Sequence, residues 1–226
     1  MLLRIYAEIV IFADIFMMYM IARFSGAIGQ VINTGIFNIF QFVLGISFLV
    51  LKTELAERII QEQENANLDA MTGCANRRAY IMEIETLENS TEQRSYLAID
   101  INGLKEVNDT YGHEAGDELI IGAARSIEQC FGEKGKILRI GGDEFIVLTA
   151  EGISDESFAA YEKRMQSWTK KHGMELSTSY GYARVQDYPG VTISELARIA
   201  DGKMYQAKAL YYRQTGKERR KHVYEK

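Results

Sequence analysis

Two long runs of apolar residues stand at the start of the chain. From Val31 to Leu51 no side chain is charged, and a helix needs roughly 20 apolar residues to cross a bilayer. The run from Leu2 to Phe24 is comparably apolar but contains charged residues, which are costly inside a membrane unless they face protein or water. These are Arg4, Glu8, Asp14 and Arg23. The pattern predicts two transmembrane helices, residues 2–24 and 31–51, joined by a short turn at Ser25 to Thr34.

A helical hairpin of this kind would leave both chain ends on one side of the membrane. Lys52 and Arg58 follow the second run and indicate that this side is the cytoplasm, although the first run has an arginine near each end. A cleaved signal peptide is the alternative for the first run, but a small-residue cleavage site and a polar start of a mature chain are missing. Glu8 and Asp14 would either sense a signal or contact a partner helix, or simply face the neighbouring helix and the headgroups.

The next segment, Lys52 to Leu68, is rich in strong helix formers, with Leu55, Ile59 and Ala66 near one face. It is expected to continue the second run out of the membrane as a stalk. A short coiled coil with a second copy and a solvated spacer are both compatible with so few heptads.

The remaining chain has the pattern of a compact domain. Helices are expected at Asn76–Leu87, Glu114–Phe131, Ser154–Lys171 and Thr192–Tyr211, and strands at Ser95–Ile101, Ile137–Ile140, Phe145–Leu148 and Glu175–Val185. Without the first helix the order is β-α-β-β-α-β, which is the split βαβ, ferredoxin-like arrangement of the α/β (α+β) class. We expect a mixed antiparallel sheet with the helices on one face. The predicted division is therefore residues 1–51, 52–68 and 69–226.

Composition and charge narrow the function. With 226 residues and 47% apolar composition, the chain has enough material for one domain of catalytic size and something smaller. A net charge of −5 argues against a nucleic-acid partner. Cys74 and Cys130 lack metal-ligand spacing, which suits a reducing compartment.

Candidate chemistry begins at Gly141-Gly142-Asp143-Glu144, between the two expected hairpin strands. We expect the glycines to supply the positive φ of a tight turn and the acids to lie at its tip. Glycine lets a ligand approach the backbone, and carboxylates are ligands that Mg²⁺ prefers. Ordinary turn chemistry would explain these residues equally well by themselves.

A second set of polar residues begins where the strand Ser95–Ile101 ends. Asp100 would be costly to bury unless it were paired or bound a metal, and in a split βαβ sheet it can lie beside the hairpin. Lys105 can neutralise phosphate charge, and Asn108 with Asp117 can read a guanine edge. Each also has a plain structural interpretation, as a solvated lysine, a helix C-cap and an acid in the first turn of a helix, so the hypothesis depends on the set.

Six blocks of sequence resemble, in order and spacing, those of GGDEF-domain diguanylate cyclases, from about Asp69 to the C-terminus. The blocks are Asp69–Arg78 (DAMTGCANRR), Asp100–Asp109 (DINGLKEVND), Gly112–Asp117 (GHEAGD), Arg139–Phe145 (RIGGDEF), Ser179–Ala183 (SYGYA) and Ala200–Lys208 (ADGKMYQAK). The resemblance implies a palm domain like that of polymerases and adenylyl cyclases, and it leaves the apolar N-terminal part outside the match.

The resemblance also implies roles. Asp100, Asp143, Glu144 and the backbone carbonyl of Ile101 match metal-binding positions for Mg²⁺ or Mn²⁺, and Asp143 and Glu144 match the catalytic acids. The substrate-binding positions are Lys105 and Lys208 for phosphate, Asn108 and Asp117 for guanine, and Gly141 and Gly142 beneath the phosphates. The implied reaction condenses two GTP into cyclic di-GMP with release of two pyrophosphates, and it requires a homodimer because each domain holds one GTP.

Several positions depart from the family pattern. Asn102 and Leu104 replace a common aspartate and phenylalanine, and Tyr212 replaces an arginine for which Arg213 would have to substitute. The stretch Gly132 to Gly135 lacks both residues of the family's RxxD product-inhibition motif, so feedback through that site should be absent. The alternatives are a catalytically silent GTP-binding or interaction module at the membrane, and a membrane assembly subunit.

Overall fold

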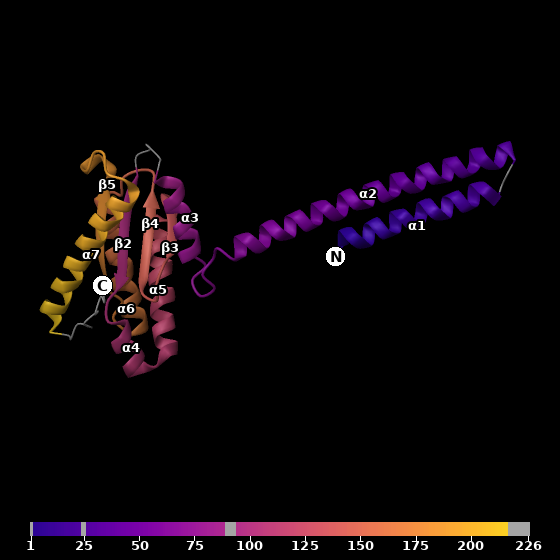
Figure 1. Cartoon of the computed structure of the whole chain (residues 1–226). Helices are drawn as coiled ribbons and strands as arrows, with labels where there is room; N and C mark the ends of the chain where they lie inside the picture. The colour runs from indigo at the N-terminus through magenta and orange to yellow at the C-terminus, as the bar shows by residue number, and fades with distance from the viewer. Residues whose placement is uncertain (1, 24–25, 89–93, 217–226) are drawn as a thin grey trace, which may run out of the picture. The chain divides into compact units, whose positions relative to one another are not determined.

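The computed structural model describes residues 2–23, 26–88 and 94–216, in two compact units, residues 1–65 and 66–226. The first unit is a pair of helices, α1 (Leu2–Arg23) and α2 (Ala27–Asn65), lying side by side (Figure 1). Within this pair the side-chain amide of Gln41 donates a hydrogen bond to Asp14 Oδ1 at 3.0 Å. Of the two explanations for Asp14, contact with the neighbouring helix is therefore the one that the structure shows.

Helix α2 differs from the expected bounds at both ends. The expected turn from Ser25 to Thr34 is wrong for most of its length, because α2 already begins at Ala27. Glycine lowers helix propensity by only about 1 kcal/mol, and this segment lacks the proline or clustered polar residues that would stop a helix. The predicted stalk is helical and continuous with the second apolar run, but the helix ends at Asn65 rather than Leu68. Leu68 instead pairs with Ala75 of the second unit.

The helix pair carries much exposed apolar surface. Phe12, Met18, Val31 and Phe42 are each 69–74% exposed. Among the described residues one helical stretch, Thr34–Glu62, is long and apolar enough to cross a membrane, and the apolar part of α1, Ile9–Met20, is shorter. Large exposed apolar patches mark contacts with protein or lipid. The structure thus supplies one candidate span, and the span at residues 2–24 stays a prediction.

The second unit contains the expected β-α-β-β-α-β order, as β2-α5-β3-β4-α6-β5, together with elements at both ends. In chain order the elements are β1 (Ala75–Asn76), α3 (Arg77–Leu87), β2 (Ser95–Ile101), α4 (Leu104–Tyr111), α5 (His113–Phe131), β3 (Gly135–Arg139), β4 (Glu144–Thr149), α6 (Asp155–His172), β5 (Thr178–Arg184), a 3-10 turn (Val185–Asp187) and α7 (Ile193–Thr215). Helix α4 and the two-residue strand β1 were not predicted, because both are too short to show a period.

The sheet has the order β1-β3-β4-β2-β5, and β2 is antiparallel to both of its neighbours. The expectation of helices on one face is wrong. Helices α5 and α6 cover the face formed by Leu97 and Ile99, while α3 and α7 cover the face of Tyr96 and Ala98 (Figure 1). Every residue of β2 is buried, because a central strand between two helical layers has no solvent face. The helices on the two faces hold the end of β2, where Asp100 lies, in place.

Gly181 of β5 determines how closely α7 approaches the sheet. A methyl group at Gly181 would lie 2.0 Å from the carbonyl oxygen of Ala200 and 2.3 Å from the backbone nitrogen of Met204, both in α7. Backbone atoms cannot rotate away from such a contact. The alanine variant must therefore push the helix off the strand.

We expect Gly181→Ala to lower the free energy of unfolding by about 1–3 kcal/mol, the usual cost of overpacking. Chemical denaturation followed by circular dichroism measures it. Gly152→Ala is the matched control, because a methyl group there meets its nearest neighbour, Arg184 Cδ, at an ordinary 3.6 Å. Equal stability of the two variants would contradict the close approach of α7.

Candidate functional site

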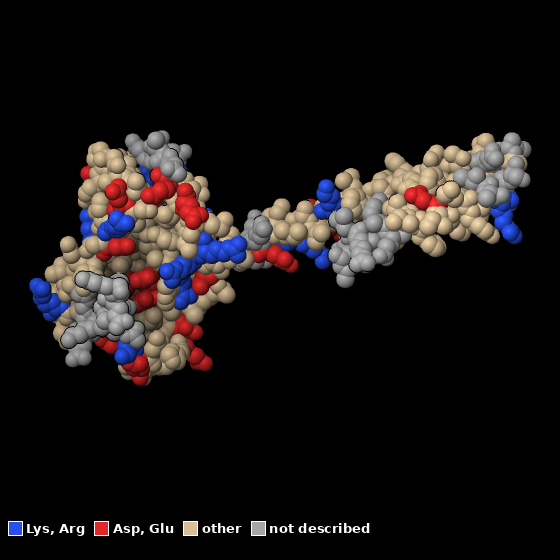
Figure 2. Space-filling model, viewed as in Figure 1, with Lys and Arg blue, Asp and Glu red and all other residues tan. Residues whose placement is uncertain are grey.

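A cleft of about 560 Å³ lies at the end of β2, between the β3–β4 loop, helix α4 and helix α7. Figure 2 shows acidic side chains gathered in a hollow of this unit. Most residues predicted for the site line this cleft, namely Asp100, Ile101, Lys105, Asn108, Gly142, Asp143, Glu144 and Lys208. They come from four separate parts of the chain, so the fold brings together what the sequence could only list.

Asp100 is the most buried acid of the cleft, with 4% of its surface exposed. In the β2–β4 ladder it lies directly opposite Glu144, and the next backbone N–H, of Ile101, donates to the Asp143 carbonyl at 3.0 Å. The expected position of Asp100 beside the hairpin is thus confirmed. Burial, reinforced by the neighbouring Asp143 carboxylate, raises the pKa of Asp100 to about 6 despite a hydrogen bond from Lys208.

Lys208 of α7 supplies the positive charge nearest to this acid. Its ammonium donates to Asp100 Oδ1 at 2.5 Å, and its side chain is 18% exposed. A buried carboxylate is stabilised only when it is paired and hydrogen-bonded. In this structure Lys208 is therefore the ion-pair partner of Asp100.

The loop between β3 and β4 carries Asp143, whereas Glu144 is the first residue of β4. The expectation that Gly141 and Gly142 have positive φ is wrong. Four residues connect the strands, and a loop of this length is commonly built around a type I turn, which needs no left-handed residue. A methyl group on Gly141 would lie 2.9 Å from Glu144 Oε2, the flexible end of that side chain, so a small shift of Glu144 would make room for it. The space around Gly142 is open, which leaves room for a ligand.

Arg139, which sequence reasoning did not single out, holds this loop in place. Its Nη2 donates to the Gly142 carbonyl at 2.8 Å and its Nη1 to Asp69 Oδ1 at 2.9 Å. Burial alone would raise the pKa of Asp69, but hydrogen bonds from Thr72 and Arg139 hold it below its usual value. Both residues belong to the quoted sequence blocks, but no local spacing connects positions so far apart.

Two glycines with positive φ place the helices beneath the cleft. Gly103, with φ of 70°, turns the chain from β2 into α4, and Gly112, with φ of 88°, separates α4 from α5. Lys105 forms an exposed ion pair with Asp109, in which Nζ and Oδ2 are 3.9 Å apart. Such a surface pair contributes little to stability. Asp117, expected beside Asn108, is exposed and does not line the cleft.

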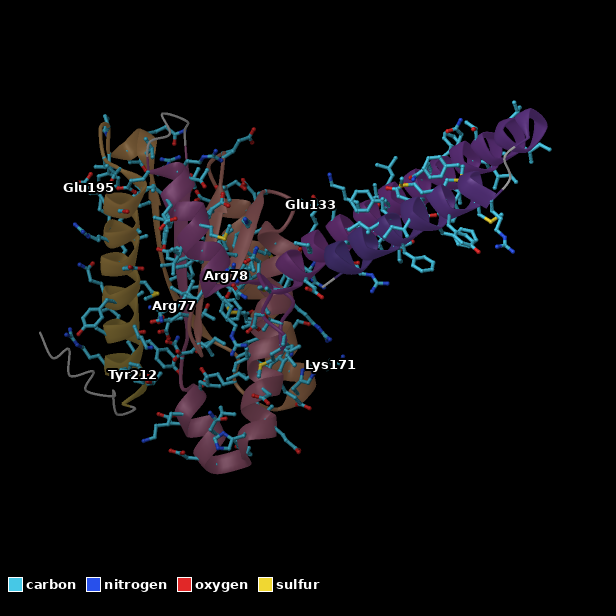
Figure 3. All side chains as sticks on the ribbon, turned by 45° about the vertical axis from the view of Figure 1, so that its right-hand side comes forward. Arg77, Arg78, Glu133, Lys171, Glu195 and Tyr212 are labelled. Atoms are coloured by element: carbon cyan, nitrogen blue, oxygen red, sulfur yellow. The ribbon has the colours of Figure 1, made fainter. Side chains whose placement is uncertain are left out.

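The departures from the family pattern have structural counterparts. Asn102 is buried, donates to Ser177 Oγ at 3.3 Å and accepts from Ser179 Oγ at 2.8 Å. Tyr212 lines the cleft near the end of α7 (Figure 3). Arg213 does not line it, so the expected substitution of Arg213 for a phosphate-binding arginine has no support.

The donor set fits a divalent cation, although the side chains are not arranged around one. Among the described residues, no group of three or more His, Cys, Asp or Glu side chains is close enough to hold a metal ion. Burial above all, and then the nearby carboxylates of Asp143 and Glu144, nevertheless raise the pKa of Asp100. Such an excess of negative charge is relieved by a hard cation.

The chain is similar to known proteins over most of its length. A family model described as "Diguanylate cyclase, GGDEF domain" matches residues 66–213. The probable diguanylate cyclase DgcI of Escherichia coli K12 is 29% identical over 208 residues, which are 86% of this chain and 45% of that protein. The cyclic di-GMP phosphodiesterase PdeB of Shewanella oneidensis is 28% identical over 173 residues, 71% of this chain and 20% of that protein.

A solved structure shows the same fold. The coiled coil and GGDEF domain of DgcB from Caulobacter crescentus, in complex with c-di-GMP, is 23% identical with a TM-score of 0.61, over 75% of this chain and 94% of that one. The chain spans less than half the length of DgcI and PdeB. The activities named for those two proteins are therefore not assigned to this chain by the similarity. Because the family model covers more than half of the chain, the chain belongs to the diguanylate cyclase GGDEF-domain family.

Proposed function

We propose that this protein is a Mg²⁺- or Mn²⁺-dependent diguanylate cyclase that condenses two GTP into cyclic di-GMP and two pyrophosphates. One observation carries the proposal: a single cleft collects five carboxylates, among them Asp100, Asp143 and Glu144, together with two lysines, an asparagine amide and an open glycine. This set supplies ligands for a cation, charge for phosphates and a polar contact for a base. A purely structural GGDEF domain would not need all of these groups to remain in one cleft.

The metal would be held by Asp100, Asp143, Glu144 and the Ile101 carbonyl, where it would neutralise charge on the α-phosphate during phosphoryl transfer. Lys208 already lies at Asp100 and would shift to the phosphates once Asp100 has another partner. Gly142 offers backbone to the triphosphate without a side chain in the way. Asn108, and Asp117 after a change of side-chain conformation, would contact guanine.

In the chemical step, the 3′-hydroxyl oxygen of one GTP attacks the α-phosphorus of the other. A new P–O bond forms, the bond to the bridging oxygen of pyrophosphate breaks, and the hydroxyl proton passes to the Glu144 carboxylate. Repetition with the roles of the nucleotides exchanged closes the ring. Each cleft has one set of base-contacting residues, so two chains must face each other, and the reaction is a property of a homodimer.

The helix pair would anchor this enzyme in the cell membrane, with the GGDEF domain in the cytoplasm. The exposed apolar stretch of α2 supports the anchoring, and Lys52 and Arg58, which follow the uncharged run 31–51, support the orientation. Leu55 and Ile59 are exposed at helical spacing on the same helix, which suits pairing of two stalks. In this arrangement the paired stalks would bring the two catalytic domains together as a dimer.

Feedback inhibition through an RxxD motif should be absent. At the matching stretch, a methyl group on Gly132 would lie 2.6 Å from the Glu128 carbonyl oxygen, and one on Gly135 would lie 2.1 Å from that of Leu148. Both positions are thus packed against backbone. A longer side chain at either position could not be accommodated without movement of the chain.

The reaction itself is tested by incubating the purified chain, in detergent micelles, with GTP and Mg²⁺ and separating the products by chromatography. We expect cyclic di-GMP from the wild type and a loss of at least about a hundredfold in rate for Asp143→Asn, since an electrostatic group acting on the transition state is removed. Asp155→Asn, an exposed acid of α6, is the matched control and should retain the rate. Binding of GTP without turnover, even in forced dimers, would favour the silent module.

Product feedback is measured by adding cyclic di-GMP to the same assay. Because the stretch Gly132 to Gly135 offers no product site, the initial rate should change by less than about twofold, which corresponds to about 0.4 kcal/mol. Strong inhibition at product concentrations comparable with that of the enzyme would contradict this expectation.

Arg139→Met tests the clamp on the catalytic loop. Loss of the two charge-assisted hydrogen bonds should speed amide hydrogen exchange in the β3–β4 loop and reduce the turnover rate roughly tenfold, because Asp143 loses its fixed position. Lys136 lies on the same strand as Arg139 and forms a partly exposed ion pair with Glu83 of α3. Lys136→Met removes that pair and serves as the control. Unchanged exchange and turnover in the Arg139 variant would show that the loop needs no clamp.

A further inference from the structure

Gly116 lies in the first turn of α5, where the backbone gives no reason for a glycine. Its φ is not positive, it is buried, and its N–H donates to the Gly112 carbonyl at 3.4 Å. Within a helix, glycine is less favourable than alanine by about 1 kcal/mol. Something other than helix geometry must therefore require the missing side chain.

The space next to Gly116 is occupied by Asn108, from the last turn of α4. A methyl group on Gly116 would lie 1.9 Å from Asn108 Oδ1, 2.8 Å from Cγ and 3.3 Å from Nδ2, and these are its three nearest atoms. Gly112, between the helices, has φ of 88° and donates its N–H to the Asn108 carbonyl at 3.0 Å. This turn folds α4 against α5 (Figure 1) and sets the amide of Asn108 on Gly116.

The contact matters because Asn108 lines the nucleotide cleft. Within residues 2–23, 26–88 and 94–216, no group holds the side-chain amide of Asn108 by a hydrogen bond. Packing against Gly116 therefore restricts where the amide lies. Asp117 follows Gly116 directly, so the same turn of α5 supports both residues proposed to contact guanine.

We propose that Gly116 is a positioning residue for nucleobase selection, which holds the Asn108 amide at the depth where it contacts guanine. This inference rests on the proposed function. A methyl group at position 116 leaves the helix intact, even favoured, but forces the Asn108 amide to rotate out of its place. The fold tolerates the change, and guanine recognition does not.

The test measures binding without turnover. Dissociation constants for the α,β-methylene analogues of GTP and ATP are determined by equilibrium dialysis on the full chain in detergent micelles, together with the unfolding temperature. For Gly116→Ala we expect the preference for the guanine analogue to fall roughly tenfold, about the worth of one hydrogen bond. The dissociation constant for the adenine analogue should not increase, and the unfolding temperature should not fall.

A double-mutant cycle separates positioning from general damage. In an Asn108→Ala background there is no amide to displace, so adding Gly116→Ala should not reduce the preference further. Gly122→Ala is the matched control on the same helix, because a methyl group there would lie 2.5 Å from Trp168 Nε1. It should lower the unfolding temperature without altering the preference.

Three results would overturn the inference. Gly116→Ala could keep the full preference for guanine, its effect could persist in the Asn108→Ala background, or it could weaken both analogues equally while lowering the unfolding temperature. A wild type with no preference for the guanine analogue would instead remove the proposed function, and the inference with it. Retained preference in the wild type separates the two failures.

Discussion

The buried carboxylate of Asp100 is the constraint on which the site depends. Water is nearly excluded from it, and its pKa is raised to about 6 by burial and by the charge of Asp143. A carboxylate in this position is unfavourable unless a cation stays close. Lys208 provides that cation, and so α7, more than a hundred residues further along the chain, must pack against β2 for the domain to be stable.

The fold satisfies this constraint by making β2 the central strand of a sheet covered on both faces. Antiparallel pairing places the start of β4 opposite the end of β2, which brings Glu144 to Asp100 and Asp143 to Ile101. Arg139 then fixes the loop between the strands from the other side, through Gly142 and Asp69. The geometry of the cleft therefore follows from strand order and from a few glycines that allow close approach.

Sequence patterns predicted most of the large elements, and β2 was placed at its observed bounds. The pattern of apolar residues along the chain can be recognised without knowledge of the tertiary contacts. They also led to the residues of the cleft, since blocks of polar residues follow the expected strands. Contacts between distant segments were not predictable. The Arg139–Asp69 pair, the Lys208–Asp100 pair and the seating of Asn108 on Gly116 depend on tertiary packing, which no local spacing reports. The expected positive φ at Gly141 and Gly142 was wrong because a four-residue loop can be closed by a type I turn, which needs no left-handed residue.

We propose that Asp100 creates the place where a cation and a nucleotide bind together. The most direct measurement is Mn²⁺ binding by electron paramagnetic resonance, with and without a non-hydrolysable GTP analogue, in the wild type and in Asp100→Asn. We expect the analogue to tighten Mn²⁺ binding in the wild type, and Asp100→Asn to weaken Mn²⁺ binding by at least about tenfold, since a charged ligand is lost. Equal Mn²⁺ affinity in the two proteins would contradict it.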